Sequence, residues 1–199
     1  MADNILNTIL RLNKTVISFK ELLMLFPDSD INILKSKINY YIKQGKLYHI
    51  RRGLYGKDKK YDRLELANKI LIPSYISFET VLVSYGIVFQ YYESIFIATY
   101  QSRNIICDSQ EYIFKSIKSS ILTNTNGIEI KENYSIASLE RAFLDVIYLN
   151  INYHFDNLVP LNWEKVYEIM PIYKNKRLEK MVRKYHKFFL SNSRSLWWD

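Results

Sequence analysis

The sequence predicts an α+β protein in which a helical N-terminal segment ending in a β-hairpin precedes a small sheet packed with helices. Apolar residues recur every three to four positions over residues 4–44 and again over 137–190, which is typical of amphipathic helices. Between these segments, residues 94–136 contain short runs rich in Ile, Tyr, Phe and Thr, separated by polar turns. Such runs favour the strands of a mostly antiparallel sheet.

The composition supports a packed core. The 199 residues are 48% hydrophobic, with five Gly, four Pro and one Cys, which excludes collagenous, low-complexity and disulfide-stapled chains. Cys107 is expected to be a small buried hydrophobic residue. The sequence contains neither a secretory leader nor a run of about 18 apolar residues, and it therefore predicts a cytoplasmic protein without a membrane-spanning segment.

Three helices are expected first, over residues 4–12, 19–26 and 28–44. Ser18 and Glu21 have the spacing of a capping box, Pro27 ends the second helix, and Gly45 ends the third. The third helix has this apolar stripe: Ile31, Leu34, Ile38, Tyr41 and Ile42. Its opposite face carries side chains that hydrogen-bond to base edges or phosphates: Asn32, Lys35, Ser36, Asn39 and Lys43.

A basic hairpin follows at once. Leu47–Ile50 and Leu54–Tyr55 are β-prone, and Arg51, Arg52 and Gly53 form the turn between them. A helix followed directly by a basic hairpin is typical of a winged helix-turn-helix, in which the helix enters the DNA major groove and the wing meets the backbone or minor groove. We therefore predict a DNA-binding domain over residues 1–60 that uses the five polar residues of the third helix together with Arg51 and Arg52.

The charge distribution agrees with that prediction. The net charge is +8, yet residues 1–60 hold 12 Lys or Arg against 5 Asp or Glu, while residues 61–173 hold 8 against 13. Residues 174–199 are basic again, with 8 against 2. Two basic ends around an acidic middle indicate localised contacts with a polyanion at the N-terminal end. For the C-terminal end we favour solvation of the basic face over contact with a polyanion.

A second domain is expected over residues 61–199. Helices are predicted over 61–71 and 78–85, the latter capped by Ser77, and over 137–149, capped by Ser138. Two more follow over 163–170 and 175–190. The strands between them are predicted at 94–100, 103–107, 112–117, 127–131 and 134–136. The helix over 137–149 is expected to cover one face of the sheet.

The chain resembles the AbiEi-type antitoxins, which are winged-helix repressors of type IV abortive-infection toxin-antitoxin systems. Four motifs in the same order carry the resemblance: the Arg51-Arg52-Gly53 wing, the Tyr75-Ile-Ser-Phe-Glu79 segment of a helix ending in Gly86, the Ala98-Thr99 strand, and the Ala137-Ser-Leu-Glu-Arg-Ala-Phe-Leu-Asp145 helix. Family members commonly have Pro where this chain has Leu139, and the C-terminal part is shorter than in the larger members.

The resemblance implies an autorepressor that binds inverted repeats of double-stranded DNA in its own promoter. It also implies a C-terminal domain that opposes a nucleotidyltransferase toxin without forming a stable complex with it. The candidate surface for that activity is Glu140, Arg141 and Asp145. A structural ion pair between Arg141 and Asp145, four residues apart on one helix, is the interpretation that we favour for them.

Two other functions stay open. The alternative to a repressor-antitoxin is a winged-helix regulator whose C-terminal domain dimerises or senses a ligand. A metal-dependent nuclease using Asp108, Glu129 and Lys131 is a less favoured alternative. The three His residues are scattered and one Cys cannot form a zinc site. The sequence therefore predicts a non-enzymatic protein with no catalytic residue, no metal ligand and no cofactor.

Overall fold

A computed structural model describes residues 2–195, and side chains are described for residues 5–191. The chain forms two compact units. The first runs up to Ile72 and includes Cys107–Ser109, and the second comprises Pro73–Ile106 and the chain from Gln110 onward. The division therefore falls after Ile72, further along the chain than the boundary predicted after residue 60.

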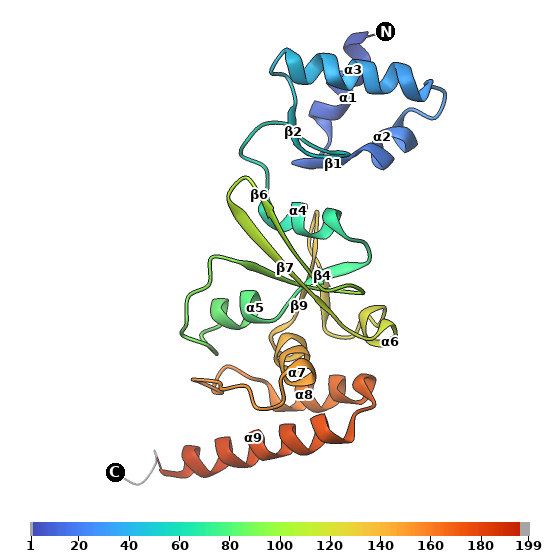
Figure 1. Cartoon of the computed structure of the whole chain (residues 1–199). Coiled ribbons are helices and arrows are strands. Elements are labelled where there is room, and N and C mark those ends of the chain that lie inside the picture. The colour runs from blue at the N-terminus through green and yellow to red at the C-terminus, as the bar shows by residue number, and fades with distance from the viewer. Residues whose placement is uncertain (1, 196–199) are drawn as a thin grey trace. The chain divides into compact units, whose positions relative to one another are not determined.

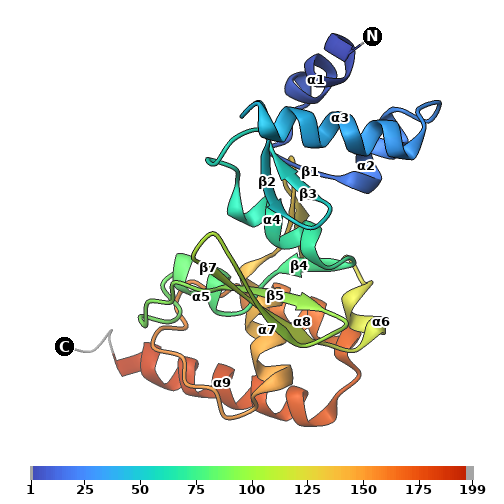
Figure 2. The same ribbon diagram turned by 45° about the horizontal axis from the view of Figure 1, so that its top comes forward.

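The first unit contains the three predicted helices, the predicted hairpin and one more helix. Its elements are α1 (Ala2–Arg11), β1 (Val16–Ser18), α2 (Phe19–Leu25), α3 (Ile31–Lys43), β2 (Tyr48–Arg51), β3 (Leu54–Gly56) and α4 (Arg63–Ile70). The strands pair antiparallel in the order β1-β3-β2. Helices α1, α2 and α3 gather beside this small sheet (Figure 2).

Apolar side chains from all of these helices but α4 meet in one core. The cluster comprises Ile5, Ile9, Ile17, Leu22, Leu34, Ile38, Tyr41 and Leu47. Helix α3 contributes Leu34, Ile38 and Tyr41, which are spaced four and three positions apart and so lie on one face. That face is buried against the core, and the opposite face is exposed to solvent.

The second unit is built on a six-stranded sheet of order β6-β7-β5-β4-β9-β8. Its elements are β4 (Ser74–Ile76), α5 (Glu79–Ser84), β5 (Ile95–Thr99), β6 (Arg103–Cys107), β7 (Gln110–Ser116), α6 (Ser119–Leu122), β8 (Ile128–Ile130), β9 (Ser135–Ala137), α7 (Leu139–Leu149), α8 (Trp163–Ile169), a 3-10 turn η1 (Met170–Tyr173) and α9 (Lys176–Ser195). The mixed helix and strand content confirms the α+β class.

This sheet is mixed, whereas the sequence predicted a mostly antiparallel one. Strand β4 pairs antiparallel with β5 but parallel with β9, and β5 pairs parallel with β7. The sequence prediction also lacked β4, which follows Pro73 and is only three residues long. The prediction that Ser77 is the N-cap of the following helix was wrong. Phe78 holds the N-cap position of α5 with a φ of 57°, and Ser77 is buried.

Helix α7 is the centre of the second unit. It packs against α5, α8 and α9 and contacts β9 (Figure 1). Ser138 caps it as predicted, by accepting a hydrogen bond from the backbone N–H of Arg141. Cys107 is buried and free, as predicted. Among the helices within residues 2–195, none combines the length and the apolar character that crossing a membrane requires.

Candidate nucleic-acid interface

Helix α3 presents a polar, cationic face to solvent. Asp30 begins the helix by accepting hydrogen bonds from the backbone N–H groups of Asn32 and Ile33, at 2.8 and 3.0 Å. The core holds one side of the helix through Leu34 and Ile38. All five residues predicted to contact DNA from this helix are exposed: Asn32, Lys35, Ser36, Asn39 and Lys43. The helix itself contains no Asp or Glu.

Three residues of this face were missed by the sequence analysis. Ile33 and Tyr40 are 55% and 54% exposed, and Lys37 lies half-buried between them. Ile31 was predicted to be part of the buried stripe, but it is 49% exposed because it is the first residue of the helix. The signal for Ile33 and Tyr40 was their seven-residue spacing, which places two residues on one face two turns apart.

These side chains line a shallow groove along α3. The groove has a volume of about 420 Å³ and is lined by Asn32, Ile33, Ser36, Lys37, Tyr40 and Tyr41. The ring of Tyr40 meets that of Tyr41 edge-on, with 5.9 Å between the ring centroids, so its position is fixed by a buried neighbour. The groove therefore combines amide and hydroxyl groups with an apolar lining.

The hairpin places its two arginines in different environments. Arg52 is exposed at the turn, whereas Arg51 is the last residue of β2, is half-buried and has a buried Nη1 with no hydrogen-bond partner among the described residues. Gly53 has a φ of 76°, a conformation that favours glycine, and its carbonyl accepts a hydrogen bond of 2.8 Å from the N–H of Phe19. The turn is thus tied to the start of α2. Arg52 forms no hydrogen bond or ion pair with the residues whose side chains the structure describes.

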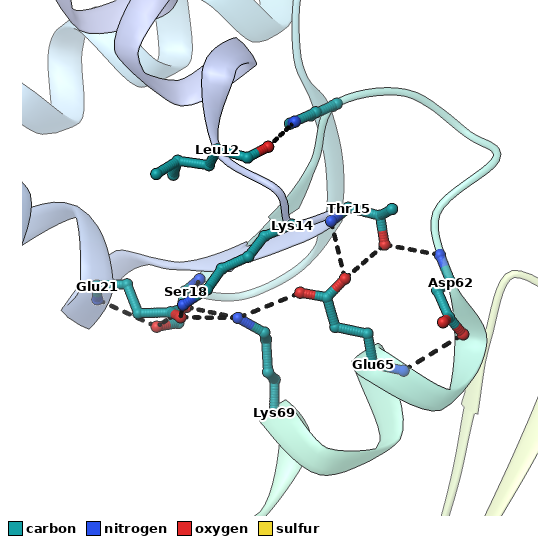
Figure 3. Close-up of polar contacts among 9 residues, drawn as sticks. Leu12, Lys14, Thr15, Ser18, Glu21, Asp62, Glu65 and Lys69 are labelled. Carbon is teal, nitrogen blue, oxygen red and sulfur yellow. Dashed lines mark hydrogen bonds and ion pairs between the residues drawn. The ribbon is translucent and has the colours of Figure 1, made fainter. Parts of the chain in front are cut away.

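Helix α4 is fastened to the first unit by a polar network (Figure 3). The carboxylate of Glu65 accepts hydrogen bonds from the backbone N–H and hydroxyl of Thr15, at 2.8 and 2.7 Å, and the Thr15 hydroxyl accepts one from the N–H of Asp62. Lys69 donates to both carboxylate oxygens of Glu21, at 2.8 and 2.9 Å. This network explains why the unit extends to Ile72.

Glu21 also forms the predicted capping box of α2. Its carboxylate accepts a hydrogen bond of 2.8 Å from the N–H of Ser18, and the Ser18 hydroxyl accepts one of 3.1 Å from the N–H of Glu21. Burial raises the pKa of Glu21, but hydrogen bonds from Lys14, Lys69 and Ser18 outweigh that effect and lower it from 4.5 to about 2.

This lowered pKa predicts an acid-sensitive start of α2. Because the folded pKa lies below the unfolded one, the stabilisation by the Glu21 carboxylate is fully present above about pH 4.5 and is lost as the pH falls towards 2. We expect Glu21→Gln to lower the thermal unfolding midpoint at pH 7, and the difference from the wild type to shrink steadily between pH 4.5 and 2. Circular dichroism melts across that range measure it. A difference that is constant with pH would contradict the assignment, and Glu129→Gln, which removes an exposed carboxylate, is the control.

The candidate antitoxin surface is not a surface. Arg141 and Asp145 are 0% exposed and Glu140 is 7% exposed, so the proposal that these residues meet a partner is corrected. The guanidinium of Arg141 donates to the carbonyls of Ile121 and Asn126, at 2.7 and 2.8 Å, and its Nε lies 3.5 Å from Asp145. The three residues are buried because α7 packs against strand β9 and helices α5, α8 and α9.

Two of the four sequence motifs converge on this buried pair. From the Tyr75–Glu79 motif, the hydroxyls of Tyr75 and Ser77 donate to Asp145, at 2.9 and 2.8 Å, and Arg141 donates to the Tyr75 hydroxyl at 3.0 Å. The hydroxyl of Tyr173 donates to the other Asp145 oxygen at 2.7 Å. Burial raises the pKa of Asp145, although the positive charge of Arg141 acts to lower it. Burial also raises the pKa of Tyr75 and Tyr173, so both hydroxyls stay neutral and donate hydrogen bonds. Residues of these two motifs therefore form a buried polar network in the second unit.

Helix α9 carries a second basic groove. It has a volume of about 560 Å³ and is lined by Ile151, Asn152, Arg177, Lys180, Met181, Arg183, Lys184 and Lys187. All five cations of this lining are exposed. This arrangement of cations around Met181 is compatible with two roles. The charged ends of the side chains can be solvated while their stems cover Met181, or the charges can bind a polyanion.

The residues of the nuclease alternative have other partners. Glu129 and Lys131 form an ion pair of 2.7 Å with each other, and both side chains are about half exposed. Asp108 belongs to the first unit and accepts hydrogen bonds from the hydroxyls of Tyr48 and Tyr61, at 3.0 and 2.8 Å. Within the part of the chain whose side chains are described, no three His, Cys, Asp or Glu residues come together as a metal site would require.

Comparison with known proteins adds no relative. No protein-family model matches the chain, and a search of curated proteins found no match. The resemblance to AbiEi-type antitoxins therefore rests on the four sequence motifs.

Proposed function

We propose that this protein is a sequence-specific DNA-binding autorepressor and the antitoxin of a type IV abortive-infection system. Its first unit would be a winged helix-turn-helix. The order of α1, β1, α2, α3 and a hairpin, with strands ordered β1-β3-β2, supports this assignment. The observation that carries the DNA-binding part is the exposed face of α3, where every residue predicted to meet DNA is solvent-accessible and no acidic residue stands among them.

The division of labour on DNA follows from the side-chain chemistry. Asn32, Ser36 and Asn39 carry amide and hydroxyl groups that read base edges in the major groove, and Asn pairs with adenine in particular. Lys35, Lys43 and Arg52 would neutralise phosphates, which supplies affinity that falls as salt rises. The helix and hairpin lie on one unit with one core, so both would dock as one body.

The antitoxin part rests on the four motifs alone. A nucleotidyltransferase encoded beside this chain would be the toxin, opposed without a stable complex. Since Glu140, Arg141 and Asp145 are buried, the opposing activity would come from other residues of the second unit. A regulator whose second unit dimerises or senses a ligand is the competing proposal.

Removing the wing cation tests the DNA-binding part. We expect Arg52→Ala to weaken binding to the protein's own promoter by roughly ten-fold, because it deletes a charged hydrogen bond worth about 1.5 kcal/mol. The slope of log affinity against log salt should fall by about one, as for one lost phosphate contact. Mobility-shift titrations at several salt concentrations measure both quantities.

Lys184→Ala is the matched control, since it removes an exposed cation from α9 in the second unit. Unchanged affinity of the Arg52→Ala variant would reject the wing, and a loss for Lys184→Ala would point to α9 as a DNA contact. The same Arg52→Ala chain, expressed from an unrelated promoter, should still protect cells from the neighbouring nucleotidyltransferase. Failure of the wild-type chain to protect them would reject the antitoxin part while leaving the repressor part standing.

A further inference from the structure

Two exposed apolar side chains stand on the DNA-facing side of α3 and need an explanation. Ile33 and Tyr40 are more than half exposed, although the core of the first unit is closed without them by Leu34, Ile38 and Tyr41. They lie two turns apart, about 10 Å along the helix axis. Both line the shallow groove on α3, with Ser36 between them.

The surroundings of the two side chains indicate what covers them. Lys37 lines the same groove, and Lys43 lies about one turn after Tyr40 on the same helix, which has no acidic residue. A protein partner with an apolar patch would gain nothing from these cations, whereas a nucleic-acid duplex would meet them with phosphates. In the major groove, the only apolar group on the edge of a base pair is the C5-methyl group of thymine.

We infer that Ile33 and Tyr40 read thymine methyl groups and so help to choose the operator. This inference rests on the proposed DNA binding and specifies it further. The roughly 10 Å between the two side chains spans at most about three base pairs, at about 3.4 Å per base pair. Each half of the inverted repeat would therefore hold two thymines within that separation, beside the adenines that Asn residues read.

Replacing thymine by deoxyuridine tests the inference, because deoxyuridine lacks the methyl group and keeps every hydrogen-bonding group. After the bound segment of the promoter is mapped, each thymine is replaced in turn and the affinity of the whole protein is measured by fluorescence anisotropy. We expect a loss of about four-fold at two thymines in each half-site, the value of burying one methyl group. Ile33→Ala should abolish the loss at one of them, and Tyr40→Ala at the other.

Two matched variants separate this role from a general loss of contact. Ile31→Ala shortens another exposed isoleucine of α3, outside the groove, and should keep the full discrimination. Tyr40→Phe keeps the ring and should keep it too. If the promoter is bound specifically but thymine and deoxyuridine give equal affinity at every position, the inference is wrong while the proposed DNA binding stands.

Two further outcomes distinguish failure of the proposed function from failure of the inference. Absence of specific binding to the promoter would reject the proposed function itself, before any deoxyuridine is tested. If Ile33→Ala and Tyr40→Ala change the oligomeric state in sedimentation runs, and the thymine dependence is unchanged, the apolar face is an interface between two copies of the chain and the inference is wrong. All three alanine variants should remain folded, with a cooperative thermal unfolding transition, because the three side chains are about half exposed and lie outside the core.

Discussion

Replacing Arg141 by Met should destabilise the second unit by about 3–5 kcal/mol, the range for breaking one side of a buried ion pair. The substitution keeps a long side chain but leaves Asp145, which is 0% exposed, without its opposite charge. The carbonyls of Ile121 and Asn126 would lose their guanidinium donors as well. Urea unfolding followed by tryptophan fluorescence measures the effect on this unit, since Trp163 begins α8 and the sequence of residues 1–72 contains no Trp.

An exposed ion pair supplies the control. Lys131→Met removes one partner of the pair with Glu129, where both side chains are about half exposed, and should cost at most about 1 kcal/mol. If Arg141→Met is as mild as Lys131→Met, the network of Tyr75, Ser77 and Asp145 does not hold the second unit together. The account of this buried network as a stabilising element of the second unit would then be wrong.

Replacing Asn39 by Ala should change the choice of DNA sequence. Asn39 is exposed near the middle of the α3 face, and its amide has the donor and acceptor that adenine requires. We expect the affinity for the promoter to fall by about 1–3 kcal/mol, and the affinity for a scrambled duplex of the same composition to stay unchanged. Competition titrations at one salt concentration measure both. An equal loss on the two duplexes would make Asn39 a backbone contact.

Local sequence patterns predicted much of the first unit. Helices α1, α2 and α3, the capping box of Ser18 and Glu21, and the hairpin around Gly53 all follow from apolar spacing, caps and turn residues within a few positions. The polar face of α3 was predicted for the same reason. Its apolar members Ile33 and Tyr40 were missed, because a single helix does not reveal which of its apolar residues the core leaves outside.

Long-range pairing limited the prediction of the second unit. Strand β4 gains its identity from hydrogen bonds to β5 and β9, far along the chain, and a three-residue run next to Pro73 carries little local signal. Parallel pairing of β5 with β7 is likewise a tertiary feature. The burial of Arg141 and Asp145 was hidden because charged residues four apart are usually exposed on a helix. The hydroxyl donors that make their burial tolerable come from Tyr75, Ser77 and Tyr173.

Lys69 and Glu65 explain why the domain boundary was placed too early. The polar stretch after Gly56 has the composition of a linker, and the sequence prediction ended the first domain there. The side chains of the following helix reach back to Thr15 and Glu21, which makes α4 part of the first unit. Contacts over some fifty positions are not visible in local composition.

The central claim is that the first unit binds a defined DNA sequence. It is tested most directly by the ratio of the affinities of the whole wild-type protein for its own promoter and for a scrambled duplex, measured in the same buffer at physiological salt. The account predicts that the promoter is bound at least about 10³-fold more tightly, the lower end for specific DNA-binding proteins. Equal affinity for the two duplexes would contradict it.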